Sequence, residues 1–349
     1  MKPAAFSGRG IHFILSVCIV LLFHAGVDGS ENMMTLYYPP DKSVMEFGLL
    51  EVVVGLPQGS AERLEITVNK KKNVRTIEKD RPYQCLSVRT APGVNSIGIV
   101  AVKENRTVGS VAFTVFQRSD LIGQYRDVPA GYRKDYFHMK SHDECSRCHT
   151  LSATSDDRKP VTLKTYLQMA SGKGVSAKAS TCYSCHKGLT DYPYVHGPAS
   201  LWSCLSCHSP SADPVYSVEQ PVANVCYTCH TEQKRDWAEK KYQHGPVTLG
   251  QCTICHSPHG SANPFNLYKP TWNLCITCHA EKATGEHVLS GDFSSGGHPT
   301  HNRMDPLRPG KELTCASCHN PHASDSRHLW AFKVDNVFQL CLKCHKDKP

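Results

Sequence analysis

HGPVTLGQCTICHSPHG, residues 244–260, places three histidines and two cysteines in one short stretch that has almost no side chain able to build a core. The first histidine lies eight residues before the cysteine pair. The second directly follows that pair, and the third lies three residues further on. This spacing favours ligand binding over packing, and variants of it recur through the last two thirds of the chain.

The cysteines fall into one repeated pattern. Sixteen of the 18 cysteines in the 349 residues form eight C-x-x-C pairs, and a histidine directly follows every pair. A small disulfide-linked domain would not need that histidine. The eight motifs are CSRCH (145–149), CYSCH (182–186), CLSCH (204–208), CYTCH (226–230), CTICH (252–256), CITCH (275–279), CASCH (315–319) and CLKCH (341–345).

C-x-x-C-H is the attachment signature of c-type haem. Two thiols three positions apart lie on one side of a helical turn, where they can form thioethers to the two vinyl groups of one porphyrin. The next imidazole then points at the iron. The sequence therefore predicts eight covalently bound haems c. The thioether cysteines would be Cys145, Cys148, Cys182, Cys185, Cys204, Cys207, Cys226, Cys229, Cys252, Cys255, Cys275, Cys278, Cys315, Cys318, Cys341 and Cys344, and the proximal iron ligands His149, His186, His208, His230, His256, His279, His319 and His345.

Other cysteine chemistry explains the pattern less well. A tetrahedral zinc site gains nothing from a histidine after each second cysteine. Redox C-x-x-C pairs do not need it either, and iron–sulfur clusters require four thiolates grouped around each cluster. Haem also accounts for the scarcity of apolar runs in residues 138–349, because eight flat macrocycles would supply the buried apolar surface that the polypeptide lacks.

Ten further histidines lie in residues 138–349, whereas residues 31–120 contain none. Eight haems with two histidines each would need eight of them. Repeated spacing favours the two His-Gly-Pro histidines, those in CHSPH and CHNPH, and one that lies seven residues before Cys145. The ranking of His138, His142, His287, His298, His301 and His328 stays open. The expected distal ligands are His138, His142, His196, His244, His259, His287, His298 and His322, with His301 and His328 as spares.

The third motif departs from the pattern, because CHSPS places Ser211 where the fifth motif has His259. We expect the missing ligand to come from elsewhere or to be absent. Methionine is the weaker alternative, since Met139, Met169 and Met304 more plausibly serve packing.

Residues 31–120 predict an all-β domain. Segments such as LEITV and SIGIVAV alternate apolar with other residues, as half-buried strands do. The stretches 91–95 and 104–107 are turn candidates. The run APGVNSIGIVAV…VGSVAFTVF resembles the last strands of bacterial immunoglobulin-like modules, which implies an immunoglobulin-like sandwich. Cys85 is expected to be a buried thiol, or else an intermolecular disulfide.

The expected order along the chain is a signal peptide (1–29), the β-sandwich (31–120), a linker (121–137) and a haem-packed, mostly irregular domain with short helices (138–349). Lys2 and Arg9 precede an apolar run (11–23) that is too short to span a bilayer. Short helices are expected at 161–170 and 232–242. The signal predicts export to the periplasm or the outer cell surface.

The segments HGPVTLGQCTICHSPHG with LCITCH (274–279) and CASCHNPH with LCLKCH (340–345) resemble the octahaem and other multihaem c-type cytochromes with doubled C-x-x-C-H repeats. HGPASLWSCLSCHSP with VCYTCH (225–230) is a third copy. The resemblance implies electron transfer in the periplasmic or extracellular respiration of anaerobic bacteria. The implied partners are other cytochromes or extracellular electron acceptors, and an outer-membrane complex, a homo-oligomer and a filament all stay open.

An electron conduit without catalytic residues is the first functional hypothesis. The alternative is a reductase of a small nitrogen or sulfur oxyanion with one open haem. Nucleic-acid binding is not needed to explain the net charge of +8. Sixteen haem propionates would bring the exported protein to about −9, so the basic residues offset the cofactors. The β domain could dock a partner or act as a spacer.

Overall fold

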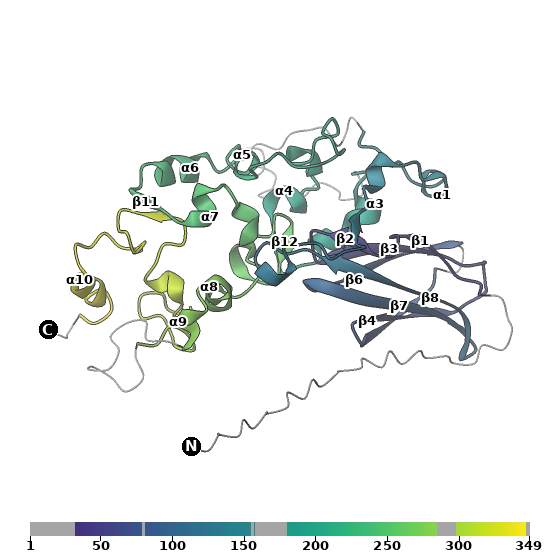
Figure 1. Ribbon diagram of the computed structural model, residues 1–349, viewed down its shortest axis with the longest axis horizontal. Helices are drawn as coiled ribbons and strands as arrows, with labels where there is room; N and C mark the ends of the chain where they lie inside the picture. The colour runs from purple at the N-terminus through teal and green to yellow at the C-terminus, as the bar shows by residue number, and fades with distance from the viewer. Residues whose placement is uncertain (1–31, 79–80, 155–156, 158–179, 285–297, 347–349) are drawn as a thin grey trace, which may run out of the picture.

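The structure is a computed structural model (Figure 1). Figure 1 shows two regions that differ in secondary structure. One consists of strands, and the other is a series of short elements that begins beside β1 and β3 and ends at α10, far from the strands. The described residues are 32–78, 81–154, 157, 180–284 and 298–346. The predicted signal peptide and the helix expected at 161–170 lie outside them.

Two sheets form the strand-rich region. The first is antiparallel, in the order β1 (Thr35–Tyr38), β3 (Leu49–Gly55), β6 (Tyr83–Arg89). In the second, β2 runs parallel to both of its neighbours and the other pairs are antiparallel. Its order is β5 (Lys71–Thr76), β4 (Arg63–Val68), β7 (Gly93–Lys103), β8 (Arg106–Gln117), β2 (Ser43–Met45), β9 (Arg133–Lys134).

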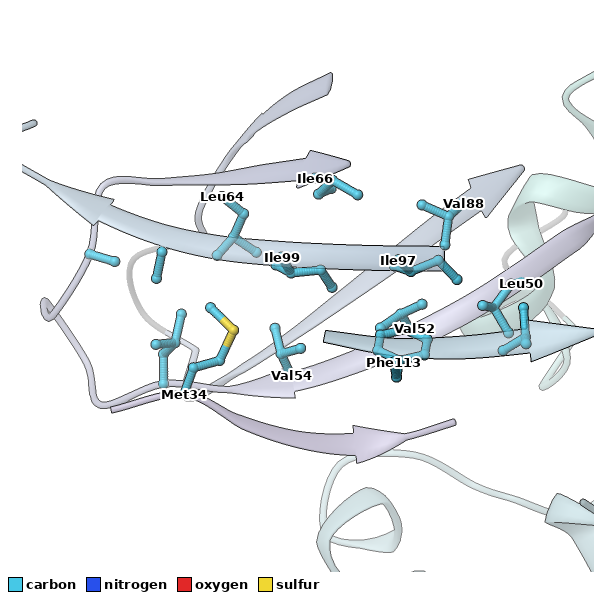
Figure 2. Close-up of a cluster of buried hydrophobic side chains, with 14 residues drawn as sticks. Met34, Leu50, Val52, Val54, Leu64, Ile66, Val88, Ile97, Ile99 and Phe113 are labelled. Carbon is cyan, nitrogen blue, oxygen red and sulfur yellow. The ribbon is translucent and has the colours of Figure 1, made fainter. Parts of the chain in front are cut away.

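Alternating side chains build the core between these sheets. Ile97, Ile99 and Ala101 on β7 are fully buried, as are Val52 and Val54 on β3. Figure 2 shows apolar side chains of both sheets gathered in one layer, among them Ile97, Ile99, Val52 and Val54. The strand-rich N-terminal region predicted from the period of two is therefore confirmed.

Tight turns sit where the sequence has turn residues. Glu104 and Asn105 link β7 to β8, and Asn69 and Lys70 link β4 to β5. All four have positive φ angles, between 47° and 71°, as two-residue hairpin turns of type I′ require. The expected turn at 104–107 thus begins at Glu104.

The remainder of the chain consists of short helices, single 3-10 turns and two-residue strands, as expected. No described element after β9 exceeds eight residues. The helix expected at 232–242 covers Thr231–Ala238. The elements are η1 (Gly123–Tyr125), η2 (Phe137–Met139), α1 (Asp143–Ser146), α3 (Tyr183–His186), η5 (Lys187–Thr190), β10 (Tyr194–Val195), α4 (Gly197–Ser200), η6 (Cys204–Ser206), α5 (Ala223–Cys226), α6 (Thr231–Ala238), β11 (Tyr242–Gln243), α7 (Gly245–Thr248), η7 (Cys252–Ile254), β12 (Gly260–Ser261), η8 (Pro264–Asn266), α8 (Thr271–Cys278), α9 (Glu281–Thr284), η9 (Cys315–Ser317), β13 (Ala323–Ser324) and α10 (Val337–Cys341).

Buried apolar side chains are distributed very unevenly. Residues 32–121 contain 17 of the described buried hydrophobic residues, whereas the described part of 138–349 contains five. Those five are Trp202, Ala223, Leu274, Leu313 and Ala323. The described part of residues 138–349, here called the motif region, therefore has no apolar core of its own. Within the described ranges, no helix has the length and hydropathy needed to cross a bilayer.

Candidate haem sites

A cavity of about 3100 Å³ runs through the motif region. A pocket for one small molecule usually measures about 300–1000 Å³, so this space can hold several cofactor-sized groups. Cysteines or histidines from the first seven motifs line it. The outer face of the β1–β3–β6 sheet contributes Leu49, Glu51 and Cys85 to the same wall.

Each motif is locally built in the same way. In all eight, the amide of the histidine donates a hydrogen bond of 2.9–3.1 Å to the carbonyl of the first cysteine. This contact closes one helical turn, which brings the two thiols and the imidazole to one side of the chain. The sequence argument for thioether attachment required this arrangement.

A second contact orients three of the motif imidazoles. The Nδ1 atom of His208 donates to the carbonyl of Tyr216 at 2.7 Å, and that of His256 donates to the carbonyl of Phe265 at 2.8 Å. His319 does the same with the carbonyl of His328, at 2.7 Å. A ring whose Nδ1 atom is the donor presents its Nε2 lone pair to the cavity, as a metal-ligating histidine does.

Among the described residues, six motif histidines face a histidine from outside the motifs. A metal–imidazole bond is about 2 Å long and the ring centre lies about 1 Å beyond it, so two imidazoles on opposite sides of one metal have centres about 6 Å apart. Rotation about these bonds leaves the distance unchanged. The observed pairs are His138–His186 (6.3 Å, planes at 34°), His196–His230 (6.3 Å, 12°), His208–His259 (6.0 Å, 8°), His244–His279 (6.1 Å, 25°), His256–His322 (6.0 Å, 16°) and His298–His345 (6.2 Å, 87°).

Several of these rings are held neutral. Burial, together with neighbouring imidazoles, lowers the pKa of His186, His259 and His322 to about 4. The neutral ring is the form that binds a metal. The residues present therefore fit haem iron with two axial histidines at six places.

The remaining candidate histidines lie elsewhere. His142 packs parallel to Phe137, with ring centres 3.8 Å apart, and its Nε2 atom is hydrogen bonded to the Phe137 carbonyl. The ring of His301 lies 4.0 Å from Trp272, and that of His328 lies 5.5 Å from Trp330. His287 lies outside the described residues.

Cysteines of neighbouring motifs also meet, which the sequence reasoning did not foresee. Three pairs of thiols are in hydrogen-bonding contact, and in each pair the first cysteines of two successive motifs are involved. The shared hydrogen bond lowers the pKa of one thiol and raises that of the other. The pairs are Cys182–Cys204, Cys226–Cys252 and Cys275–Cys315.

The strand-rich region contacts the candidate sites directly. The ring of Phe47 lies edge-on to His259, with centres 5.1 Å apart. Arg89 donates to the Asp191 carbonyl at 2.6 Å and lies 4.0 Å above the Tyr192 ring. One face of the first sheet is thus a wall of the cavity.

Cys85 lies on that wall, and the expectation that it is a buried thiol is wrong. On β6, Gln84 and Val88 face the core, so the alternation of the strand turns Cys85 outward. Its side chain is exposed and lines the cavity.

Comparison with known proteins gives one informative match. No curated protein matches the chain. Among solved structures, an FMN-binding beta-glucuronidase from Facaelibacterium prausnitzii L2-6 is 17% identical, with a TM-score of 0.20, over 30% of this chain and 13% of that one. An engineered protein is 11% identical, with a TM-score of 0.21, over 25% of this chain and 20% of that one. The chain thus spans a fifth or less of either structure. Residues 196–235, 244–284 and 306–349 match the family described as doubled CXXCH motif, a motif that indicates covalently bound haem c.

Proposed function

We propose that this chain is an octahaem c-type cytochrome that conducts electrons through a row of haems with two axial histidines. The observation that carries the proposal is the set of six imidazole pairs, each joining a motif histidine to a histidine outside the motifs at 6.0–6.3 Å. When bound, haem c supplies one-electron redox chemistry at its iron.

The proposed ligand sets follow from these pairs. His186, His208, His230, His256, His279 and His345 are the proximal ligands of six irons, and each motif cysteine pair holds the same haem. Their distal ligands are, in that order, His138, His259, His196, His322, His244 and His298. His149 and His319 are the proximal ligands of the remaining two haems.

The polypeptide brings neighbouring sites together. The thiol contacts join the second motif to the third, the fourth to the fifth and the sixth to the seventh. The cavity reaches the first seven motifs. Adjacent attachment points favour transfer from haem to haem over chemistry at a single centre.

The axial ligands influence the haem potentials, and the basic residues influence the net charge of the assembled protein. Histidine pairs should keep the potentials low, because methionine is the axial ligand that raises them. The apoprotein charge of +8 offsets propionates on the assembled protein. We further propose an exported protein that exchanges electrons with other cytochromes or extracellular acceptors, and an immunoglobulin-like identity for the strand-rich region. These last proposals rest on the sequence alone.

Haem stoichiometry tests the central proposal. The pyridine haemochrome of the purified holoprotein should give eight haems c per chain. Replacing Cys182 and Cys185 with serine should remove one haem, whereas the matched variant Cys85→Ser should remove none. A wild-type count well below eight, or a count unaffected by the double substitution, would contradict the assignment. Fractionation of the producing cells tests export separately.

A further inference from the structure

The histidine three residues after an odd-numbered motif obeys a rule. His259 follows the fifth motif and faces His208 of the third, at 6.0 Å. His322 follows the seventh motif and faces His256 of the fifth, also at 6.0 Å. In both cases this histidine serves the site two motifs earlier.

A second rule covers the histidine that precedes an odd-numbered motif. This histidine faces the histidine of the next, even-numbered motif. Thus His196 faces His230, His244 faces His279 and His138 faces His186. The two rules together reproduce all six observed pairs. The sixth, His298–His345, also obeys the second rule.

The first rule assigns Ser211 to the first motif. Ser211 occupies the third position after His208, where its counterparts are His259 and His322. By the same step of two motifs, its position belongs opposite His149. The third motif does not lack a ligand, because His259 faces His208. The irregular CHSPS segment therefore affects the first site and leaves the third intact.

The backbone near Ser211 departs from the repeat as well. In the later units the amide of His196 donates to the His259 carbonyl, and that of His244 donates to the His322 carbonyl, at 2.8 and 2.9 Å. In the first repeat, the corresponding segments are the one around His138 and the one that follows Ser211. The contacts described between them are not backbone hydrogen bonds of this type. The Val215 amide donates to the sulfur of Met139 at 3.4 Å, and the ring of His138 meets that of Tyr216 at 4.8 Å.

No described histidine ring is paired with His149. His142, the nearest candidate in the sequence, stacks on Phe137 and has its Nε2 atom hydrogen bonded. His287 follows the sixth motif in the sequence and lies outside the described residues. Glu144 and Arg147, at this motif, line the cavity, and Arg81, which also lines it, is ion-paired with Glu78 at 3.1 Å.

We propose that the haem held by Cys145 and Cys148 has one axial position without a protein histidine, and that this position binds small exogenous ligands. The inference rests on the proposed function. It places a candidate for substrate chemistry at the first site, beside the β1–β3–β6 sheet, in a protein that otherwise conducts electrons.

Spectroscopy on the holoprotein tests this. We expect a high-spin ferric EPR signal of about one haem in eight, its conversion to low spin by cyanide, and binding of about one carbon monoxide per reduced chain. Ser211→His should abolish all three. The control Ser209→His places an imidazole two positions earlier on the same segment and should leave them unchanged.

The outcomes separate the two proposals. Eight haems that are all low-spin and bind no carbon monoxide would overturn the open site, for example because Met139 is the ligand, and would leave the conduit intact. A high-spin signal that persists in a fully loaded Ser211→His protein would overturn its placement at the first motif. Should Ser211→His fail to mature, the wild-type spin count still decides. A haem count well below eight would defeat the proposed function itself.

Discussion

The amide nitrogen of His196 donates a hydrogen bond to the carbonyl oxygen of His259 at 2.8 Å, and the Nδ1 atom of His196 lies 2.9 Å from the carbonyl oxygen of Pro258. These two histidines face the motif histidines of two different sites. The segment that carries the histidine facing one motif therefore also orients the histidine that faces the next motif. This shared construction gives a physical reason for the doubling of the motifs, because neither site is complete without the other segment.

Replacing His259 with methionine should raise the potential of one haem in eight. Methionine in place of an axial histidine raises the potential, and axial ligands span a range of about 0.8 V across haem proteins. A spectropotentiometric titration should show one component moving upward while the haem count stays at eight.

The matched control is His142→Met. His142 stacks on Phe137 and faces no motif histidine, so the titration curve should not change. Equal shifts in the two variants would contradict the assignment of His259 as a ligand.

Local patterns in the sequence were enough to predict part of this structure. The alternation of Ile97, Ile99 and Ala101 predicts a buried strand face, and the single turn of each C-x-x-C-H motif follows from its spacing. The pairing of distal and motif histidines did not follow from the sequence. It depends on pairs of strands such as Tyr194–Val195 with Gly260–Ser261, which are too short to show any periodicity.

The cavity wall illustrates a different limit. The sequence places Cys85 within an expected strand, and only the register of β6 against β3 shows which face it occupies. Contacts between the strand-rich region and the motif region determine which sheet face covers the candidate haem sites. The contact of Arg89 with Tyr192 is one of them. The residues at 133–134, within the predicted linker, pair with β2 as β9. Contacts between regions leave little trace in local patterns.

Removing the cofactor should unfold only part of the chain. Residues 32–121 hold 17 of the described buried hydrophobic residues, whereas the motif region relies on groups it would bind covalently. A variant with all sixteen motif cysteines changed to serine should keep a protease-resistant fragment close to residues 32–121 and lose protection after residue 138. Mass spectrometry of the digest gives the boundaries. Equal protection of the motif region in the holoprotein and in this variant would refute the dependence on haem.

The thiol count of the denatured holoprotein should be one per chain. Sixteen cysteines would be thioethers and Cys18 would leave with the signal peptide, so Cys85 alone remains. The thiol lies on the cavity wall, where partial desolvation raises the pKa of Cys85, so it should react slowly near neutral pH in the native protein although it is exposed. Titration with a thiol reagent in denaturant, with Cys85→Ser as the zero point, measures this. Two thiols would indicate a retained leader, and none, together with a dimer on a non-reducing gel, an intermolecular disulfide.

Glu51 should make stability depend on pH. It lies on the cavity wall, and burial raises the pKa of its carboxyl to about 7, although the hydrogen bond from Ser87 Oγ, at 2.8 Å, opposes this. The folded protein therefore holds a proton that the unfolded chain releases near its ordinary value of 4.5. Its contribution to stability is complete below that value and is lost as the pH rises through about 7.

Two variants test this predicted loss of stability with rising pH. Glu51→Gln should weaken the fall in Tm between pH 5 and pH 8, and Ser87→Ala, which removes a hydrogen bond to the charged form, should move the fall to higher pH. About 1 kcal/mol corresponds to about 4–8 °C for a domain of about 60–100 residues, which thermal melts resolve. Glu104→Gln, on an exposed turn away from the cavity, is the control. Identical pH profiles for Glu51→Gln and the wild type would mean that this carboxyl stays ionised, for instance because bound haem changes its surroundings.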